Sequence, residues 1–210
     1  MGYATAKISD YLSDAASDKP APGGGSVSAL VGALAASMSE MAANFTSGRK
    51  KFQAVQADIS QCLQRLTACR AKLLALMDAD VEVYKAVSEA CALPKHTAQE
   101  SAVRAEAVQS ALQEAMKVPL SVMRQCAVVG EIAARLVRIA NPNLITDVGV
   151  SAILAEAACA AAALNVQINL DSITDPTVAE RVRPETAELI RTTAQRRSAV
   201  QRAVQAHLSG

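Results

Sequence analysis

The sequence predicts an all-α protein of about six helices, forming a single domain over residues 1–210. Hydrophobic residues make up 51% of the chain, yet aromatic residues make up only 2% and tryptophan is absent. Such a core must be filled by Ala, Leu, Val, Ile and Met, and alanine lets helix backbones approach closely. Apolar residues also recur at helical spacing along nearly the whole chain. Packed helices are therefore favoured over a sheet.

Prolines, glycines and capping residues divide the chain into the expected helices. Ser26 is the expected N-cap of the second helix, and Thr97 with Glu100 predicts a capping box for the fourth. Pro119 should kink or split that fourth helix. The stretch 165–170 could fray into extended structure. The expected ranges are 6–17, 26–46, 49–91, 97–139, 148–165 and 176–208.

Two long stretches, 27–46 and 148–170, are apolar around most of the helix circumference. Six helices of a chain this size leave part of that surface uncovered, so we expect a homodimer or a dimer-based oligomer. Both stretches have membrane length, but they are rich in alanine and contain Glu40 and Glu156. We interpret them as buried helices and expect no membrane partner.

Charge and cysteine content argue against several functional classes. A formal net charge of +1 provides no basic field for nucleic acid. The five cysteines are odd in number and form no CxxC pair, and only two histidines occur, so we expect neither a disulfide framework nor a metal site. The first residues lack the pattern of a signal peptide, which favours a cytoplasmic protein.

The first candidate site is the segment PAPGGGSVSAL at 20–30. Its simplest interpretation is a stiff connector with Ser26 as a helix cap. Alternatively, Gly23, Gly24 and Gly25 let the main chain approach a planar ligand without Cβ atoms in the way. Free N–H groups at the helix start could then face a carboxylate or a ring carbonyl.

The second candidate is the basic run Arg49, Lys50 and Lys51 at the start of a helix. Basic side chains there oppose the helix dipole, so they stand against the local preference. A solvated face would explain such a run. The functional interpretation is a docking point for a polyanionic tail.

The third candidate is the segment DADVEVY at 78–84, inside a helix otherwise rich in Leu and Ala. Asp80 and Tyr84 share one face of that helix, at i and i+4. A polar outer face would account for the segment. The alternative is a carboxylate whose pKa is raised by apolar neighbours, so that it exchanges protons near neutral pH.

The fourth candidate is the loop NPNLITDVG at 141–149. Asp147 could simply cap the following helix. Asn141, Asn143 and Asp147 together would also suit hydrogen bonding to the edge of a heterocycle that has both donors and acceptors.

In combination, seven segments resemble the cyclodeaminase domain of formiminotransferase-cyclodeaminase and its stand-alone bacterial relatives, which include methenyltetrahydrofolate cyclohydrolases. The resemblance covers nearly the whole chain, in the family's order. The segments are PAPGGGSVSAL at 20–30, MAANFTSGRKKF at 41–52, DADVEVYKAV at 78–87, ALPKHT at 92–97, KVPL at 117–120, NPNLITDVGV at 141–150 and NVQINLDSITD at 165–175.

The resemblance implies an all-helical dimer that binds tetrahydrofolate derivatives near the subunit interface. It associates Asp80, the second aspartate of the DAD segment, with cyclodeaminase activity, and our hypothesis is that Asp80 is the general acid and base. Tyr84 departs from the phenylalanine expected in this family, and Thr146 from the commoner serine. We expect the pterin end to be held by residues of the glycine and asparagine segments, namely Gly23, Gly24, Gly25, Ser26, Asn141, Asn143 and Asp147. Tyr84 is a further expected substrate-binding residue. Arg49, Lys50 and Lys51 would meet the glutamate tail, which in cells often carries further glutamates.

The expected reaction converts 5-formimino-tetrahydrofolate to 5,10-methenyl-tetrahydrofolate and ammonia. The alternative is a cyclohydrolase that interconverts 5,10-methenyl- and 10-formyl-tetrahydrofolate, and a non-catalytic folate-binding helical protein is a third interpretation. Neither reaction needs a metal or a permanently bound cofactor, since the folate itself is the substrate. A formiminotransferase domain does not fit in this chain, so another protein would supply the formimino group.

Overall fold

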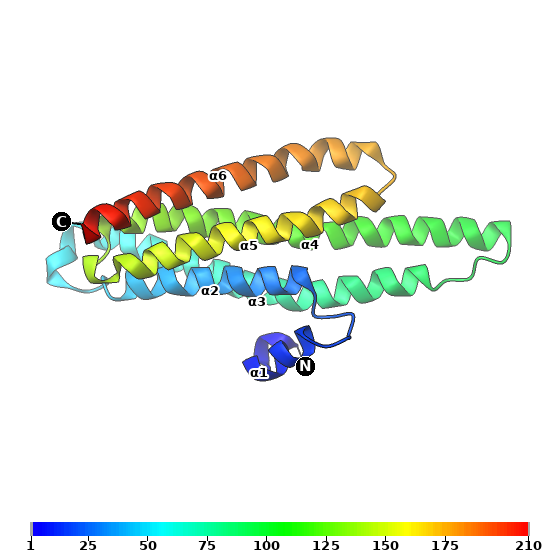
Figure 1. Ribbon diagram of the computed structural model, residues 1–210, viewed down its shortest axis with the longest axis horizontal. Helices are drawn as coiled ribbons and strands as arrows, with labels where there is room; N and C mark the ends of the chain where they lie inside the picture. The colour runs from blue at the N-terminus through cyan, green and yellow to red at the C-terminus, as the bar shows by residue number, and fades with distance from the viewer. Residues whose placement is uncertain (1, 210) are drawn as a thin grey trace.

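The computed structural model describes residues 2–209, and these form an elongated bundle of six α-helices with no strand within that range (Figure 1). This confirms the all-α prediction. The α-helices are α1 Ile8–Ala15, α2 Gly24–Asn44, α3 Gln56–Cys91, α4 Ala98–Ile139, α5 Ile145–Ser172 and α6 Pro176–Leu208. Three short 3₁₀ turns, η1 Tyr3–Thr5, η2 Lys50–Val55 and η3 Pro142–Leu144, join or precede them.

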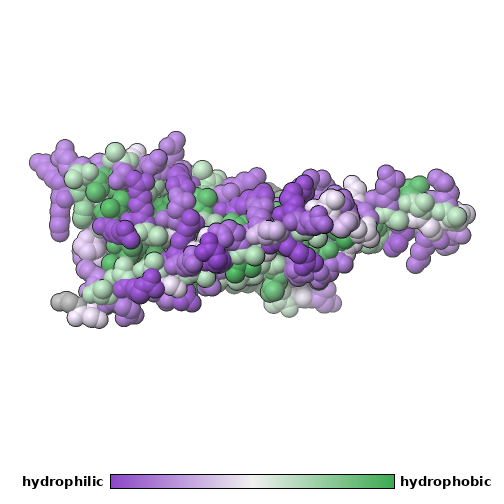
Figure 2. Space-filling model, turned by 90° about the horizontal axis from the view of Figure 1, so that it is seen from above, coloured by the Kyte–Doolittle hydropathy of each residue, from purple (hydrophilic) through white to green (hydrophobic). Residues whose placement is uncertain are grey.

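Helices α2 and α5 run antiparallel and side by side on the near face of the molecule in Figure 1. Helices α3 and α4 form a long hairpin behind them, and its tip projects beyond the rest of the bundle. Helix α6 packs on α4 and α5, while α1 lies apart beside the start of α2. Figure 2, a view from above, shows the molecule narrowing to the α3–α4 tip, with polar side chains over much of this face.

The core is built mainly from Ala, Leu, Val, Ile and Met, as the composition predicted. Six alanines of α2 and five of α5 are buried, so the two helices approach closely: Ala29, Ala33, Ala35, Ala36, Ala42 and Ala43, and Ala152, Ala155, Ala158, Ala162 and Ala163. A Cβ on Gly32 would come within 3.0 Å of both the Cys126 sulfur and a Leu73 methyl. Backbone packing at this distance accepts only the smallest residues.

The start of α2 differs from the prediction. Gly23 is the N-cap residue, and Ser26 is the third residue of the helix instead of its cap. The reason is that Gly24 and Gly25 already have helical backbone angles. The Ser26 N–H donates to Asp80, and the Ser26 hydroxyl accepts from Tyr11. Ser26 is thereby fully buried.

Helix α5 is longer than predicted, and the expected fraying at 165–170 is wrong. Val166 and Leu170 face the core, which holds this stretch in the helix. The side-chain amides of Asn165 and Asn169 donate to the carbonyl oxygens four residues earlier, at 3.1 and 2.9 Å. Asparagine here supports the helix by back-bonding, although it is a poor helix former by propensity.

The remaining boundaries agree more closely. The capping box of Thr97 and Glu100 is present, and Asp175 caps α6 with Pro176 as its first residue. Pro119 does not split α4, which continues through it for 42 residues in all. The third helix begins at Gln56 instead of residue 49, because the intervening residues form η2.

An apolar strip remains exposed on α2 and α5, which we call the α2–α5 face. Both helices are long and apolar enough to cross a membrane by length and composition alone, and 61% of the α2 window but only 39% of the window in 142–172 is buried. The interpretation as buried helices therefore holds better for α2. The exposed members of the face are Val27, Leu34 and Phe45 on α2, and Val150, Ile153, Leu164 and Ile168 on α5.

Candidate active site

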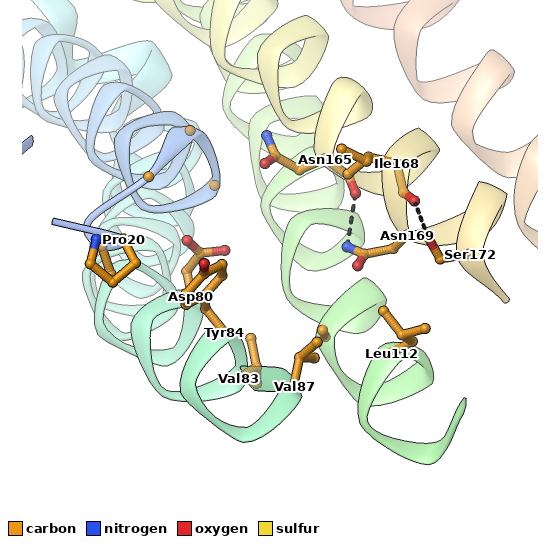
Figure 3. Close-up of a pocket in the computed structure, with 15 residues that line it drawn as sticks. Pro20, Asp80, Val83, Tyr84, Val87, Leu112, Asn165, Ile168, Asn169 and Ser172 are labelled. Carbon is orange, nitrogen blue, oxygen red and sulfur yellow. Dashed lines mark hydrogen bonds between the residues drawn. The ribbon is translucent and has the colours of Figure 1, made fainter. Parts of the chain in front are cut away.

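A cleft of about 370 Å³ opens where the start of α2 meets the C-terminal third of α3 and the end of α5 (Figure 3). One wall comes from α3, the opposite wall from α5, and the glycine run closes one side. Apolar side chains of α3 and α4 complete it, namely Val83, Val87, Leu112 and Ala115. The cleft therefore combines an apolar lining with a few polar groups, as small-molecule sites usually do.

Asp80 is the carboxylate in this cleft (Figure 3). The backbone N–H of Ser26 donates to its Oδ2 at 2.9 Å, and its Oδ1 has no hydrogen-bond partner among residues 2–209. Burial raises the pKa of Asp80 above its ordinary value, and the Ser26 N–H opposes this only in part. No described cation counteracts this rise in the pKa of Asp80. A carboxyl group with a raised pKa is a stronger base than an exposed aspartate and, once protonated, can return the proton.

Gly25 is explained by this carboxylate. A Cβ on Gly25 would lie 2.1 Å from Asp80 Oδ1, far inside van der Waals contact. A Cβ on Gly24 would meet the Asn165 side chain at 3.4 Å, an ordinary contact, whereas one on Gly23 would have nothing within 4 Å. Thus Gly25 makes room for the carboxylate, whereas a methyl group would fit at Gly24 and Gly23, which also line the cleft.

Behind the cleft, the N-terminal segment supports the start of α2. Tyr11 is buried, and its hydroxyl donates to the Ser26 hydroxyl at 3.1 Å. The Ala4 N–H donates to Asp78 Oδ1 at 3.3 Å. The two aspartates of the DAD segment therefore have separate functions, since Asp78 holds the N-terminal segment while Asp80 faces the cleft.

The α5 wall carries polar groups that the sequence analysis did not select. Asn165, Asn169 and Ser172 line the cleft opposite Asp80 and Tyr84 (Figure 3). Asn165 and Asn169 lie in the stretch 165–170, for which fraying is the sequence-based expectation, and Ser172 follows it. Asparagines at i and i+4 in an apolar helix were the signal that could have identified them.

The other predicted site residues lie at the opposite end of α2. Because α2 has 21 residues, its two ends are about 30 Å apart. Arg49, Lys50 and Lys51 are exposed beyond its C-terminal end, and none forms an ion pair with a described residue. The Arg49 guanidinium lies 5.8 Å from the centre of the Phe45 ring. This basic end of the bundle is open to solvent.

The asparagine loop is tied to that same end. The Asn141 N–H donates to the Thr46 hydroxyl at 2.8 Å, and the Asn143 N–H donates to Asn141 Oδ1 at 3.2 Å. Asp147 lies in the first turn of α5 without capping it, since Leu144 is the N-cap residue. One chain therefore brings Gly23, Gly24, Gly25, Ser26, Asp80 and Tyr84 together, and keeps Asn141, Asn143, Asp147 and the basic run apart from them.

Metal binding finds no support in the described part of the chain, where no group of three or more His, Cys, Asp or Glu side chains could hold an ion. The cysteines are free thiols. Four of them are buried, and only Cys91 is exposed.

A methenyltetrahydrofolate cyclohydrolase of Methylorubrum extorquens is 39% identical over 173 residues, which is 82% of this chain and 83% of that protein. The formimidoyltransferase-cyclodeaminase of Mus musculus is 32% identical over 86% of this chain, and this match spans only a third (33%) of the mouse protein.

A solved structure has the same fold. The crystal structure of a formiminotetrahydrofolate cyclodeaminase from Thermotoga maritima superposes with a TM-score of 0.87 at 28% identity, covering 97% of this chain and 98% of that one. A family model described as formiminotransferase-cyclodeaminase matches residues 7–188. The chain therefore belongs to the formiminotransferase-cyclodeaminase family, in which its relatives are folate one-carbon enzymes.

Proposed function

We propose that this chain acts on the one-carbon unit of tetrahydrofolate, with Asp80 as general acid and base. The observation that carries the proposal is the Asp80 carboxyl group itself. One oxygen is held by the Ser26 N–H, the other is free in an apolar cleft, and burial raises the pKa. A carboxyl group with a raised pKa is a stronger base than an exposed aspartate and can pass the proton on, which suits it to general acid and base catalysis.

We propose hydrolysis of 5,10-methenyl-tetrahydrofolate as the leading reaction. Asp80 takes a proton from water as the water oxygen bonds to the methenyl carbon between N5 and N10. The resulting carbinolamine is neutral. Asp80 then returns the proton to N5 as the bond from carbon to N5 breaks, and the hydroxyl proton leaves to solvent. The product is 10-formyl-tetrahydrofolate, with one proton released overall. The ionised carboxylate also stabilises the cationic substrate.

The sequence segments alone favour cyclodeamination over the cyclohydrolase reaction, and this order of preference is reversed here. The reversal is supported by the cyclohydrolase relative, which has the higher identity and matches this chain over most of both lengths. By contrast, the chain spans about a third of the length of the mouse bifunctional relative.

Cyclodeamination is the second candidate, and the stand-alone Thermotoga maritima cyclodeaminase supports it because it matches this chain along almost its whole length. With the formimino group in its protonated, amidinium form, N10 would bond to the formimino carbon as the double bond from that carbon to the departing nitrogen becomes single, and N10 would lose its proton to Asp80. Asp80 would then protonate the departing nitrogen, which leaves as ammonia. Holding N10 over that carbon is an orientation task that suits a rigid cleft. A separate formiminotransferase would then have to supply the substrate.

A direct assay separates the candidates. Purified protein is given 5,10-methenyl-tetrahydrofolate in one experiment and 5-formimino-tetrahydrofolate in another, and near-ultraviolet absorbance follows the methenyl form. Loss of the methenyl absorbance faster than in buffer supports the cyclohydrolase. Its appearance from the formimino substrate, with ammonia, supports the cyclodeaminase. Tight folate binding without turnover of either compound would indicate a non-catalytic folate-binding protein.

We further propose that a second copy of the chain covers the α2–α5 face. This face has the glycine end at one extremity and the basic end at the other. A two-fold axis lying in the face and running across the helices would bring the partner's basic end to this chain's cleft. The separated site residues would then meet across the interface, with the pterin at Asp80 and the glutamate tail near Arg49, Lys50 and Lys51. We place this dimer in the cytoplasm, where polyglutamylated folates occur.

A further inference from the structure

The α5 wall of the cleft has a hydrogen-bonding character that distinguishes it from the α3 wall. Asn165 and Asn169 both border the cleft and stand one helical turn apart, so their side chains share a face (Figure 3). Neither is part of the acid–base chemistry of Asp80.

Each of the two side-chain amides uses its nitrogen in a hydrogen bond within α5 and leaves its oxygen without a described donor. Asn165 Nδ2 donates to the Ala161 carbonyl at 3.1 Å, and Asn169 Nδ2 donates to the Asn165 carbonyl at 2.9 Å. These bonds orient each carboxamide along the helix. Neither Oδ1 accepts a hydrogen bond from a described residue, so each keeps its full capacity as an acceptor. The α5 wall therefore presents two oriented acceptors, the Oδ1 atoms of Asn165 and Asn169. A ligand with N–H donors would complement them.

The Asn165 carboxamide lies beside the glycine run at the start of α2. A Cβ built on Gly24 would stand at ordinary contact distance from it, 3.4 Å from Nδ2 and 3.6 Å from Oδ1. The carboxamide thus lies next to the glycine run on the wall opposite Asp80 (Figure 3). A flat ligand lying between the α3 and α5 walls would meet the acceptors with its edge.

We propose that Asn165 and Asn169 are specificity-determining residues, which accept hydrogen bonds from the amino and ring N–H groups on the pyrimidine edge of a reduced pterin. This inference rests on the proposed function and deepens it. It assigns recognition of the heterocycle to the α5 wall of this chain, instead of to Asn141 and Asn143 at the far end of α2. An edge without N–H donors would leave both acceptors unpaired, which weakens binding.

The test measures binding and not turnover. The probe is 5-formyl-tetrahydrofolate, compared with the same molecule in which methyl replaces the 2-amino group, and calorimetry gives both dissociation constants. Wild type should prefer the amino compound by about 3- to 10-fold, the effect of one or two neutral hydrogen bonds. In Asn165→Leu and Asn169→Leu, which keep the side-chain shape, that preference should fall toward one.

A matched control is Gln167→Leu, since Gln167 lies between the two asparagines in sequence but is exposed and bonds to Asp171. It should keep the wild-type preference. Asn165→Ser and Asn169→Ser keep a hydroxyl donor for the carbonyl of the preceding turn but remove the Oδ1 acceptor. They serve as the test variants if a leucine variant unfolds. Unchanged preference in the serine and leucine variants would overturn the inference alone. Failure of wild type to bind 5-formyl-tetrahydrofolate would overturn both the inference and the proposed function.

Discussion

The two ends of α2 show how differently a helix terminus can be built for function. At the glycine end, backbone and carboxylate are in contact, Ser26 is fully buried, and the pKa of Asp80 is raised by its surroundings. At the basic end, Arg49, Lys50 and Lys51 stand in solvent. Close packing within one chain fixes the geometry of the glycine end. The basic end presents positive charge that forms no ion pair with a described residue.

The difference between the two ends of α2 shows which part of the proposed function a single chain can provide. Proton transfer requires a fixed and desolvated group, and one copy supplies it. Contact with a flexible polyanion requires only nearby positive charge, and a second copy could supply that. Variants at the glycine end should therefore alter the chemistry, and variants elsewhere should alter assembly or the affinity for the tail.

The largest effect is expected from Asp80→Asn. The amide keeps the shape and can still accept from the Ser26 N–H, but it cannot exchange a proton. Turnover should fall by about 1000-fold or more. Circular dichroism should show an intact helical bundle, and normal turnover in this variant would reject Asp80 as the catalytic residue.

Next in size is Leu34→Glu, on the exposed α2–α5 face. Leu34 is 48% exposed in the single chain, so the change should be tolerated by the fold. A charge buried in the proposed dimer interface should weaken association by at least roughly 100-fold. Sedimentation velocity measures this. Val103→Glu on the projecting tip of α4, at 52% exposure, is the control. A dimer that survives Leu34→Glu would place the interface elsewhere.

Gly25→Ala should come third. The added methyl collides with the Asp80 carboxylate and must displace it, so we expect turnover to fall about 10- to 100-fold and stability by about 1–3 kcal/mol. Gly23→Ala adds the same methyl where nothing lies within 4 Å. Kinetic and thermal measurements on the pair isolate the contact, and equal behaviour of the two variants would contradict it.

The pH dependence is the fourth prediction. The ionised form of Asp80 acts as base, so kcat/KM should fall about 10-fold per unit as pH drops below its pKa, and this limb should lie above that of an exposed aspartate. The folded state holds this proton more tightly than the unfolded state, so Asp80 lowers stability as pH rises through the raised pKa. Asp80→Asn should therefore be more stable than wild type at neutral pH and lose that advantage in acid, which denaturant titration at several pH values would test.

The smallest effect is expected from Lys50→Ala. This exposed side chain should contribute only a few-fold in affinity, because surface charges are screened. The loss should be larger for a polyglutamylated folate than for the monoglutamate, in direct binding measurements at low salt. Equal loss for both ligands would argue against tail docking at the basic end.

Sequence patterns predicted the helices well because alanine-rich amphipathic periodicity and caps act locally. The capping box of Thr97 and the Pro176 start of α6 were found as expected. The end of α5 was missed because burial of Val166 and Leu170 outweighs the weak helix propensity of the asparagines beside them. Helix propensity alone does not show which side chains the tertiary structure buries.

The site was predicted in part. Asp80 and Tyr84 followed from a shared helix face, and the glycines from their unusual density. Sequence distance could not show that Asn141 lies a whole helix length away from Asp80 in the same chain, or that Asn165 lies on the wall opposite Asp80. Both facts depend on how α2 and α5 are paired.

Positions 25 and 80 share one small volume, which the carboxylate fills because the glycine leaves it empty. The two residues are thus not independent choices in evolution or in the laboratory. A longer acid at position 80 would have to find space that no further trimming of Gly25 can create. Attempts to retune this centre should begin with neighbouring side chains, not with the acid itself.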